Sequence, residues 1–297
     1  MWFVAGVSRF LIIIARPFSH STAKRRILGF DKTMSAITLA IANQKGGVGK
    51  TTTTVNLGHA LAVMGIPTLI VDMDPQANAT SCLGMEKKPG FGVYEPLLSG
   101  SDLASRVQST GRKNLWIVPS ELDLAAAELE LSQQESYLVK LRKCLESLKG
   151  NYGLKAILID CPPTLGLLSM NSLCSADHLI VTLQSEYLAL EGLDQIVSVI
   201  TQLKNSGANE KLSLGGIVMT MYDNRTRLSY EVWLEVNKHY PKEIFKTAIP
   251  RTVRLSEAPS FGKTIFEYDR QSPGAIAYSA LANEIKMRFF NDRRING

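Results

Sequence analysis

The feature that most constrains this chain is a glycine-rich loop at residues 44–51, with the sequence Gln-Lys-Gly-Gly-Val-Gly-Lys-Thr. The apolar run before it, residues 37–42, has the length of a β-strand. The run after it, residues 52–64, is long enough for a helix and ends at Gly65. A strand, a glycine-rich loop and a helix in this order are typical of a P-loop, which binds phosphates. The chain is therefore expected to contain a nucleotide-binding α/β domain.

The loop departs from the common P-loop pattern in its first half. Gln44 stands where that pattern has a glycine, and Lys45 is an additional lysine. The second half is intact, and its glycines allow backbone N–H groups to turn inward without Cβ clashes. Lys50 is expected on the β- and γ-phosphates and Thr51 on Mg²⁺. The predicted ATP-binding set includes Gly46, Gly47, Val48, Gly49, Lys50, Thr51 and Thr52.

Carboxylates follow two further predicted strands. Asp72 and Asp74 end the apolar run 69–71, and they alternate in facing, so one of them can turn toward the phosphates. Such a carboxylate can orient an attacking water or hold a metal-bound water. Asp160 follows the apolar run 156–159, as in a Walker B strand, and is a candidate magnesium ligand.

Short apolar runs alternate with helical patterns along residues 34–297. The helical patterns are the leucines at 138, 141, 145 and 148, the apolar residues at 193, 196, 197 and 200, and residues 275–290. We expect an α/β fold with a doubly wound, mostly parallel sheet flanked by helices, as one P-loop NTPase domain. The predicted strands are 37–43, 68–73, 115–119, 156–160, 178–183, 215–221 and 245–249.

Residues 1–33 form a basic N-terminal extension. It carries six of the 33 Lys and Arg residues and one of the 27 acidic residues, so most of the net charge of +6 lies there. The extension fits an organelle-targeting peptide, a membrane-surface anchor, or a disordered or non-native stretch read from an upstream start. We favour the last, because two residues separate Met34 from the first predicted strand.

The rest of the chain is almost neutral, so an argument for nucleic-acid binding must rest on placed arginines. Arg251 and Arg254 stand three apart, and Arg225 and Arg227 lie upstream. The four side chains fit a patch that contacts DNA phosphates without reading sequence, and they fit solvated loop arginines equally well.

Four cysteines, Cys82, Cys144, Cys161 and Cys174, show no CxxC pair and no metal-ligand spacing. We interpret them as reduced, partly buried thiols rather than as a Zn or Fe–S site.

Together these motifs resemble the ParA/Soj family of chromosome- and plasmid-partitioning ATPases, a branch of the MinD/ParA superfamily with a deviant Walker A loop. The resemblance covers about residues 36–290. It rests on KGGVGKTTT at 45–53, VDMDPQANAT at 71–80, IDCPP at 159–163, QSEYLALEG at 184–192, MYDNRT at 221–226 and IPRTVRLSEAPSFGK at 249–263.

The resemblance implies an ATP- and Mg²⁺-dependent switch. It implies that ATP closes a homodimer in which Lys45 reaches the partner's phosphates as a catalytic residue beside Lys50. Asp74, rather than Asp72, matches the family's hydrolysis aspartate. Pro250 and Arg251 match a segment near the adenine, and Arg225 and Arg254 match positions implicated in nonspecific DNA binding. A ParB-like protein is the implied stimulating partner, and the implied location is the cytoplasm, on the nucleoid.

Related families offer alternatives. A MinD-like membrane-cycling ATPase would carry an amphipathic C-terminal helix, and the tail 287–294 only weakly resembles one. A reductase similar to the nitrogenase iron protein would need cluster cysteines in two motifs where Cys161 and Cys174 do not lie. A cargo-positioning scaffold with little turnover is the non-enzymatic alternative.

Overall fold

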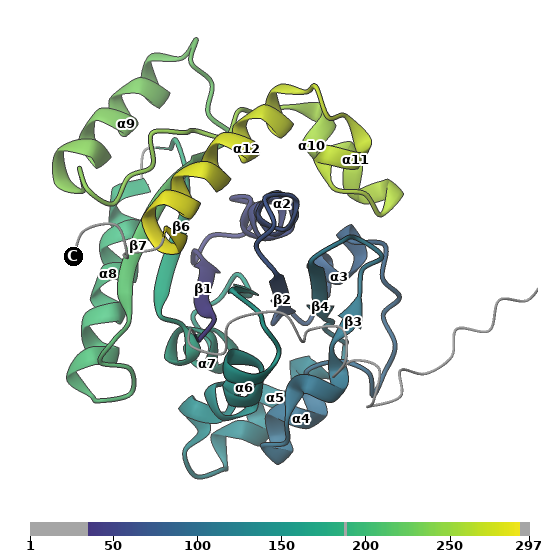
Figure 1. Cartoon of the computed structure of the whole chain (residues 1–297). Coiled ribbons are helices and arrows are strands. Elements are labelled where there is room, and N and C mark those ends of the chain that lie inside the picture. Colours follow the sequence, from purple (N-terminus) through teal and green to yellow (C-terminus); the bar gives the residue numbers. More distant parts are fainter. Residues whose placement is uncertain (1–34, 187–188, 292–297) are drawn as a thin grey trace, which may run out of the picture.

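The structure is a computed structural model that describes residues 35–186 and 189–291 (Figure 1). The predicted extension 1–33 and the predicted start at Met34 lie outside the described residues.

A seven-stranded sheet forms the centre of the molecule, in the order β3-β4-β2-β5-β1-β6-β7. Every pairing is parallel except that of β3 with β4, so the mostly parallel sheet predicted from the sequence is confirmed. The strands are β1 (Ile37–Ala42), β2 (Thr68–Asp72), β3 (Gln108–Ser109), β4 (Leu115–Val118), β5 (Ala156–Asp160), β6 (His178–Gln184) and β7 (Ser213–Thr220).

The alternation of side chains along β1 shows why both faces of the sheet are covered. Leu39 and Ile41 belong to the apolar core on one face, and Ala40 and Ala42 belong to the core on the other. A strand that is apolar on both faces must be buried on both. The chain meets this requirement with helices on each side of the sheet.

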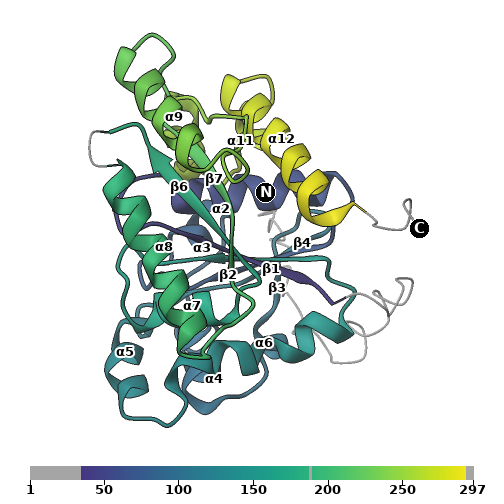
Figure 2. The same ribbon diagram turned by 90° about the vertical axis from the view of Figure 1, so that its left-hand side faces the viewer.

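One helical layer contains α2, which follows the glycine loop, and α12, which packs against it (Figure 1). Together with α3, α10 and α11, these two helices cover one face of the sheet, while α4 to α8 cover the other (Figures 1 and 2). The first layer is α2 (Lys50–Val63), α3 (Asn78–Cys82), α10 (Val253–Glu257), α11 (Ile265–Tyr268) and α12 (Pro273–Ile285).

The second layer includes the two amphipathic helices predicted from the spacing of apolar residues, although Leu138 lies in the turn before the first of them. Leu141, Leu145 and Leu148 are buried on α6, and Leu193 is buried on α8. The helix α9 contacts α8 (Figure 1). These helices are α4 (Tyr94–Ser99), α5 (Leu124–Ser132), α6 (Lys140–Asn151), α7 (Leu167–Ser175), α8 (Ala189–Asn205) and α9 (Arg227–His239), and the short 3₁₀ turns are η1 (Leu103–Arg106), η2 (Tyr137–Val139) and η3 (Ala258–Phe261).

The predicted strand at residues 245–249 is wrong. This segment runs beside β7, and isolated bridges flank it, Ile244 with Ile217 and Pro250 with Tyr222. Between those bridges the N–H groups of Lys246 and Thr247 donate to the carboxylate of Glu284 on α12, at 2.9 and 2.8 Å. Because a side chain from another element takes these donors, no continuous ladder forms. The strand β3, which has only two residues, was not predicted from the sequence.

The final predicted helix, 275–290, is interrupted near its end. The α-helix α12 stops at Ile285, and a π-helical turn, η4 (Lys286–Phe290), follows. There the Arg288 guanidinium lies 4.2 Å from the centre of the Phe245 ring, and Phe289 stacks on His178. These contacts make the turn part of the folded domain. Among the residues that the structure describes, no helix combines the length and apolarity needed to cross a bilayer.

Candidate functional site

The glycine loop forms an open cradle at the start of α2. Gly47 and Gly49 have φ values of 74° and 85°, in the left-handed region where glycine is favoured. A Cβ atom built on Gly46 or Gly47 would meet nothing within 4 Å. No side chain caps the first turn of α2. The loop therefore presents backbone N–H groups and a helix N-terminus to the open side, which is the geometry of an anion site.

Lys50 lies beneath this cradle and is almost fully buried. Its Nζ donates to the carbonyl oxygen of Lys45 at 2.9 Å. Burial lowers the pKa of Lys50, while the charges of Asp160, Cys161 and Asp74 act in the opposite direction. A carbonyl oxygen carries only a partial negative charge, so it does not fully offset the positive charge of the buried Lys50 ammonium. Phosphate oxygens would supply the remaining negative charge.

Asp160 at the end of β5 accepts two hydroxyl hydrogen bonds from α2. Thr51 Oγ1 donates to one carboxylate oxygen at 2.8 Å, and Thr54 Oγ1 donates to the other at 2.9 Å. Burial raises the pKa of Asp160, and the nearby charge of Asp72 raises it further. A divalent cation next to this carboxylate would stabilise its ionised form. The pair of Thr51 and Asp160 therefore fits a magnesium site.

In the described part of the chain, no group of three or more His, Cys, Asp or Glu side chains could hold a metal ion unaided. Mg²⁺ keeps several waters and commonly takes one or two protein ligands together with substrate phosphates. A hydroxyl and a carboxylate beside a phosphate cradle match that preference.

Asp72 and Asp74 have separate environments. Asp72 is completely buried, and one of its carboxylate oxygens accepts hydrogen bonds from the N–H and the hydroxyl of Thr80 at 2.8 and 2.7 Å. Burial raises the pKa of Asp72. Asp74 lies in the loop after β2, where it accepts a hydrogen bond from the N–H of Gln76 at 2.9 Å. Asp72 thus fastens α3 to the end of β2, and the Asp74 carboxylate stands outside that contact.

Lys45 has a partner that the sequence analysis did not find. Its Nζ makes an ion pair with the carboxylate of Glu186, just after β6. The side chains of Lys45 and Glu186 are 57% and 39% exposed. The N–H of Lys45 also donates to Asn43 Oδ1 at 3.0 Å. The sequence signal for this partner is limited to the acidic residues of the segment 184–192, which are Glu186 and Glu191.

Pro250 and Arg251 line a cavity of about 720 Å³ together with the loop after β7 and the first half of α12. Thr220, at the end of β7, donates to the carbonyl oxygen of Val48 at 2.8 Å. Tyr222, two residues further on, already lines the cavity. The cavity therefore adjoins the glycine loop.

Arg225 and Arg254 lie on the surface, with side chains 85% and 54% exposed. Arg225 holds Asp223 by two side-chain hydrogen bonds of 2.9 and 2.7 Å. These hydrogen bonds lower the pKa of Asp223 to about 2. Arg254 donates to Glu257 at 3.1 Å. Both guanidinium groups are thus accessible, and each is paired with an acidic neighbour.

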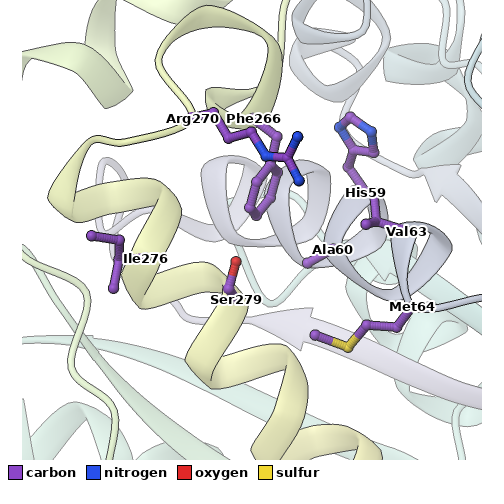
Figure 3. Close-up of a pocket in the computed structure, with 8 residues that line it drawn as sticks. All are labelled: His59, Ala60, Val63, Met64, Phe266, Arg270, Ile276 and Ser279. Carbon is purple, nitrogen blue, oxygen red and sulfur yellow. The ribbon is translucent and has the colours of Figure 1, made fainter.

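A second cavity, of about 460 Å³, lies between α2, α11 and α12 (Figure 3). His59, Val63 and Met64 reach it from the far half of α2, and Phe266 faces it from α11. Its position on α2 separates it from the glycine loop. We therefore do not assign it to the phosphate site.

The four cysteines form no disulfide among the described residues. Cys144, Cys161 and Cys174 are buried, and burial raises the pKa of the Cys161 thiol to about 12. Thiols in this environment are poor nucleophiles at neutral pH.

Comparison with known proteins finds a family model described as an AAA domain that matches residues 36–214. The sporulation initiation inhibitor protein Soj of Bacillus subtilis is 47% identical over 248 residues, which are 83% of this chain and 97% of the relative. The chromosome-partitioning ATPase Soj of Treponema pallidum is 45% identical, over 84% of this chain and 97% of the relative. A crystal structure of cobyrinic acid a,c-diamide synthase from Mycobacterium smegmatis with bound ADP and magnesium has a TM-score of 0.75 and 35% identity, over 87% of this chain and 97% of that one.

Proposed function

Because this chain belongs to the ParA/Soj family of partitioning ATPases, we propose that it dimerises on ATP, binds DNA without sequence preference and leaves DNA after hydrolysis. The chain is a P-loop ATPase with a nucleotide and magnesium site. The observation that carries the proposal is a phosphate cradle with one lysine buried beneath it and a second lysine exposed outside it.

The residues in and around the glycine loop have different roles toward ATP. Backbone N–H groups of Gly46 to Thr52 and the ammonium of Lys50 bind the phosphates. Thr51 and Asp160 would hold Mg²⁺, which neutralises charge on the phosphate oxygens. Asp74 lies in the loop beyond β2 and holds the attacking water. Pro250 and Arg251 lie against the base, which the cavity beside the glycine loop supports.

Lys45 makes the site depend on a second copy of the chain. It lies outside the cradle and is paired with Glu186 of its own chain. In the proposed dimer it exchanges this carboxylate for the phosphates of the partner, where its charge stabilises the transferring phosphoryl group.

Arg225 and Arg254 contact DNA phosphates in the ATP-bound dimer. Their exposure permits such contacts, which position a protein on the duplex without reading its sequence. A ParB-like protein stimulates hydrolysis, and the dimer resides on the nucleoid.

Co-sedimentation with DNA and with liposomes, each with ATP and with ADP, tests this proposal. We expect retention on DNA with ATP only, and affinity that falls steeply with salt. The Lys45→Ala variant should bind ATP but neither dimerise nor stay on DNA, whereas Lys50→Ala should lose ATP binding. Retention on liposomes instead would favour a membrane-cycling ATPase. DNA retention without measurable turnover would favour a positioning scaffold.

A further inference from the structure

The loop that carries Asp74 and the segment that carries Arg254 meet at one point in the fold. The first leads into α3, and the second runs through α10 and η3 to Gly262. The end of α3 and the end of η3 are in contact, although they lie far apart in the sequence. The meeting point is therefore a place where nucleotide-dependent and DNA-dependent changes could be coupled.

Two glycines allow the backbones to touch there. Gly84 and Gly262 have φ values of 73° and 60°. A Cβ atom on Gly262 would lie 2.7 Å from the Cα atom of Gly84, and one on Gly84 would lie 3.1 Å from the carbonyl oxygen of Gly262. No side chain fits between these segments, so a displacement of one presses directly on the other.

Arg112 fastens the same contact from the loop before β4. Its guanidinium donates to the carbonyl oxygens of Leu83 and Gly262 at 2.9 and 3.0 Å. It also donates to the Glu267 carboxylate on α11 at 2.9 Å. The side chain of Arg112 is only 10% exposed. One planar guanidinium thus binds the end of α3, at Leu83, to Gly262 and to Glu267 on α11.

Each side of this contact is rigidly connected to its functional residue. On one side, the N–H of Ala77 donates to the carbonyl oxygen of Asp74 at 2.8 Å, and Thr80 is fixed to Asp72. On the other side, Arg254 reaches Asp269 at 3.6 Å and pairs with Glu257, which also accepts a hydrogen bond from Tyr268 at 3.0 Å. Energetic coupling between distant sites is carried by packed, hydrogen-bonded networks of this kind.

We propose that Arg112 is a positioning residue that couples the nucleotide state at Asp74 to the DNA-binding surface at Arg254. The inference rests on the proposed function and adds its regulation. A shift of the Asp74 loop on ATP binding moves α3, and Arg112 with the glycine contact moves the segment of Arg254. In the proposed mechanism Arg112 contacts neither ATP nor DNA. It makes the affinity for DNA depend on which nucleotide is bound, and the affinity for nucleotide depend on DNA.

The test uses the full chain, random-sequence duplex DNA at fixed salt, and either ADP or a non-hydrolysable ATP analogue. The measured quantity is the ratio of the DNA dissociation constants in the two nucleotide states. Arg112→Lys keeps the charge but cannot present the planar fork to three acceptors. We expect it to bind both nucleotides normally and to reduce the ratio at least about threefold, a loss within the usual range of coupling between sites.

A matched pair of glycine variants separates coupling from stability. Gly84→Ala and Gly100→Ala place alanine at nearly the same positive φ, 73° and 72°, but a Cβ on Gly100 meets nothing within 4 Å. Both variants carry the same backbone strain, and Gly84→Ala should lower the melting temperature further because its Cβ meets the Gly262 carbonyl oxygen. The ratio compares two nucleotide states of one variant, so this loss of stability does not by itself change it. Only Gly84→Ala should reduce the ratio.

A wild-type ratio in either Arg112→Lys or Gly84→Ala would overturn the inference and leave the proposed function intact. A wild-type chain that binds DNA equally in both nucleotide states would overturn the proposed function, and the inference with it.

Discussion

At the scale of single residues, two cations of the proposed function are paired with acidic neighbours, Lys45 with Glu186 and Arg225 with Asp223. Lys50, Thr51 and Asp160 were predictable, because the chemistry of phosphate and Mg²⁺ binding fixes both their types and their spacing from strands. Glu186 and Asp223 were not, because a surface ion pair needs only proximity, and proximity depends on the fold. Both ion pairs bear on the proposed function, because Glu186 and Asp223 pair with Lys45 and Arg225, the cations that this function uses.

The pairing of Asp223 with Arg225 predicts a gain of function. Asp223→Asn removes a competitor for the guanidinium, so we expect DNA to bind about two- to fivefold more tightly, a small gain because an exposed ion pair is weak. Glu231→Gln is the control, because it frees Arg227, which pairs with Glu231 through a 2.6 Å contact. Titration of labelled duplex DNA measures both variants. An equal gain in the control would point to net charge rather than to Arg225.

At the scale of elements, periodicity predicted strands wherever the strand is buried on both faces. It failed at residues 245–249, where Phe245, Ala248 and Ile249 enclose the polar Lys246 and Thr247. The difference lies in Glu284, on a helix that follows much later in the chain and accepts hydrogen bonds from two N–H groups of the segment. A pattern confined to the segment itself contains no information about that acceptor.

Glu284 should therefore contribute to stability through backbone donors. Glu284→Ala leaves the N–H groups of Lys246 and Thr247 without this acceptor, and we expect a loss of about 1–2 kcal/mol in the free energy of unfolding. Glu284→Gln keeps one acceptor oxygen and should lose less. Urea denaturation followed by circular dichroism measures both. Equal losses in the two variants would contradict the assigned role.

At the scale of the whole molecule, the order of elements and the parallel sheet follow from alternating patterns and from the glycine loop. The contacts that tie distant segments together do not, and His59 is an example. It lies on α2, where its Nδ1 atom is 2.6 Å from Thr264 Oγ1 and its ring meets Phe266 edge to face (Figure 3). Nothing in residues 52–64 alone indicates which part of the chain covers that imidazole.

Acid should weaken the fold through this imidazole. Burial lowers the pKa of His59, so over the range just below its ordinary value the unfolded chain binds more protons than the folded chain. The contribution of His59 to the free energy of unfolding should therefore decrease as the pH falls from about 7 to about 5, whereas the raised pKa values of Asp72 and Asp160 act in the opposite direction. Thermal melts should show that the wild type loses stability relative to His59→Gln as the pH falls across this range. The same acid sensitivity in both proteins would exclude His59 as a source.

The ion pair between Lys45 and Glu186 is weak as well as specific. Both side chains are substantially exposed, and a pair of this kind contributes about 0–1 kcal/mol, comparable to thermal energy. Lys45 consequently leaves and rejoins its own carboxylate spontaneously, and no input from ATP is needed to release it. In the proposed dimer, an approaching second copy would meet a lysine that already samples free positions. We therefore expect encounter between two chains, rather than breakage of a contact within one, to set the pace of assembly.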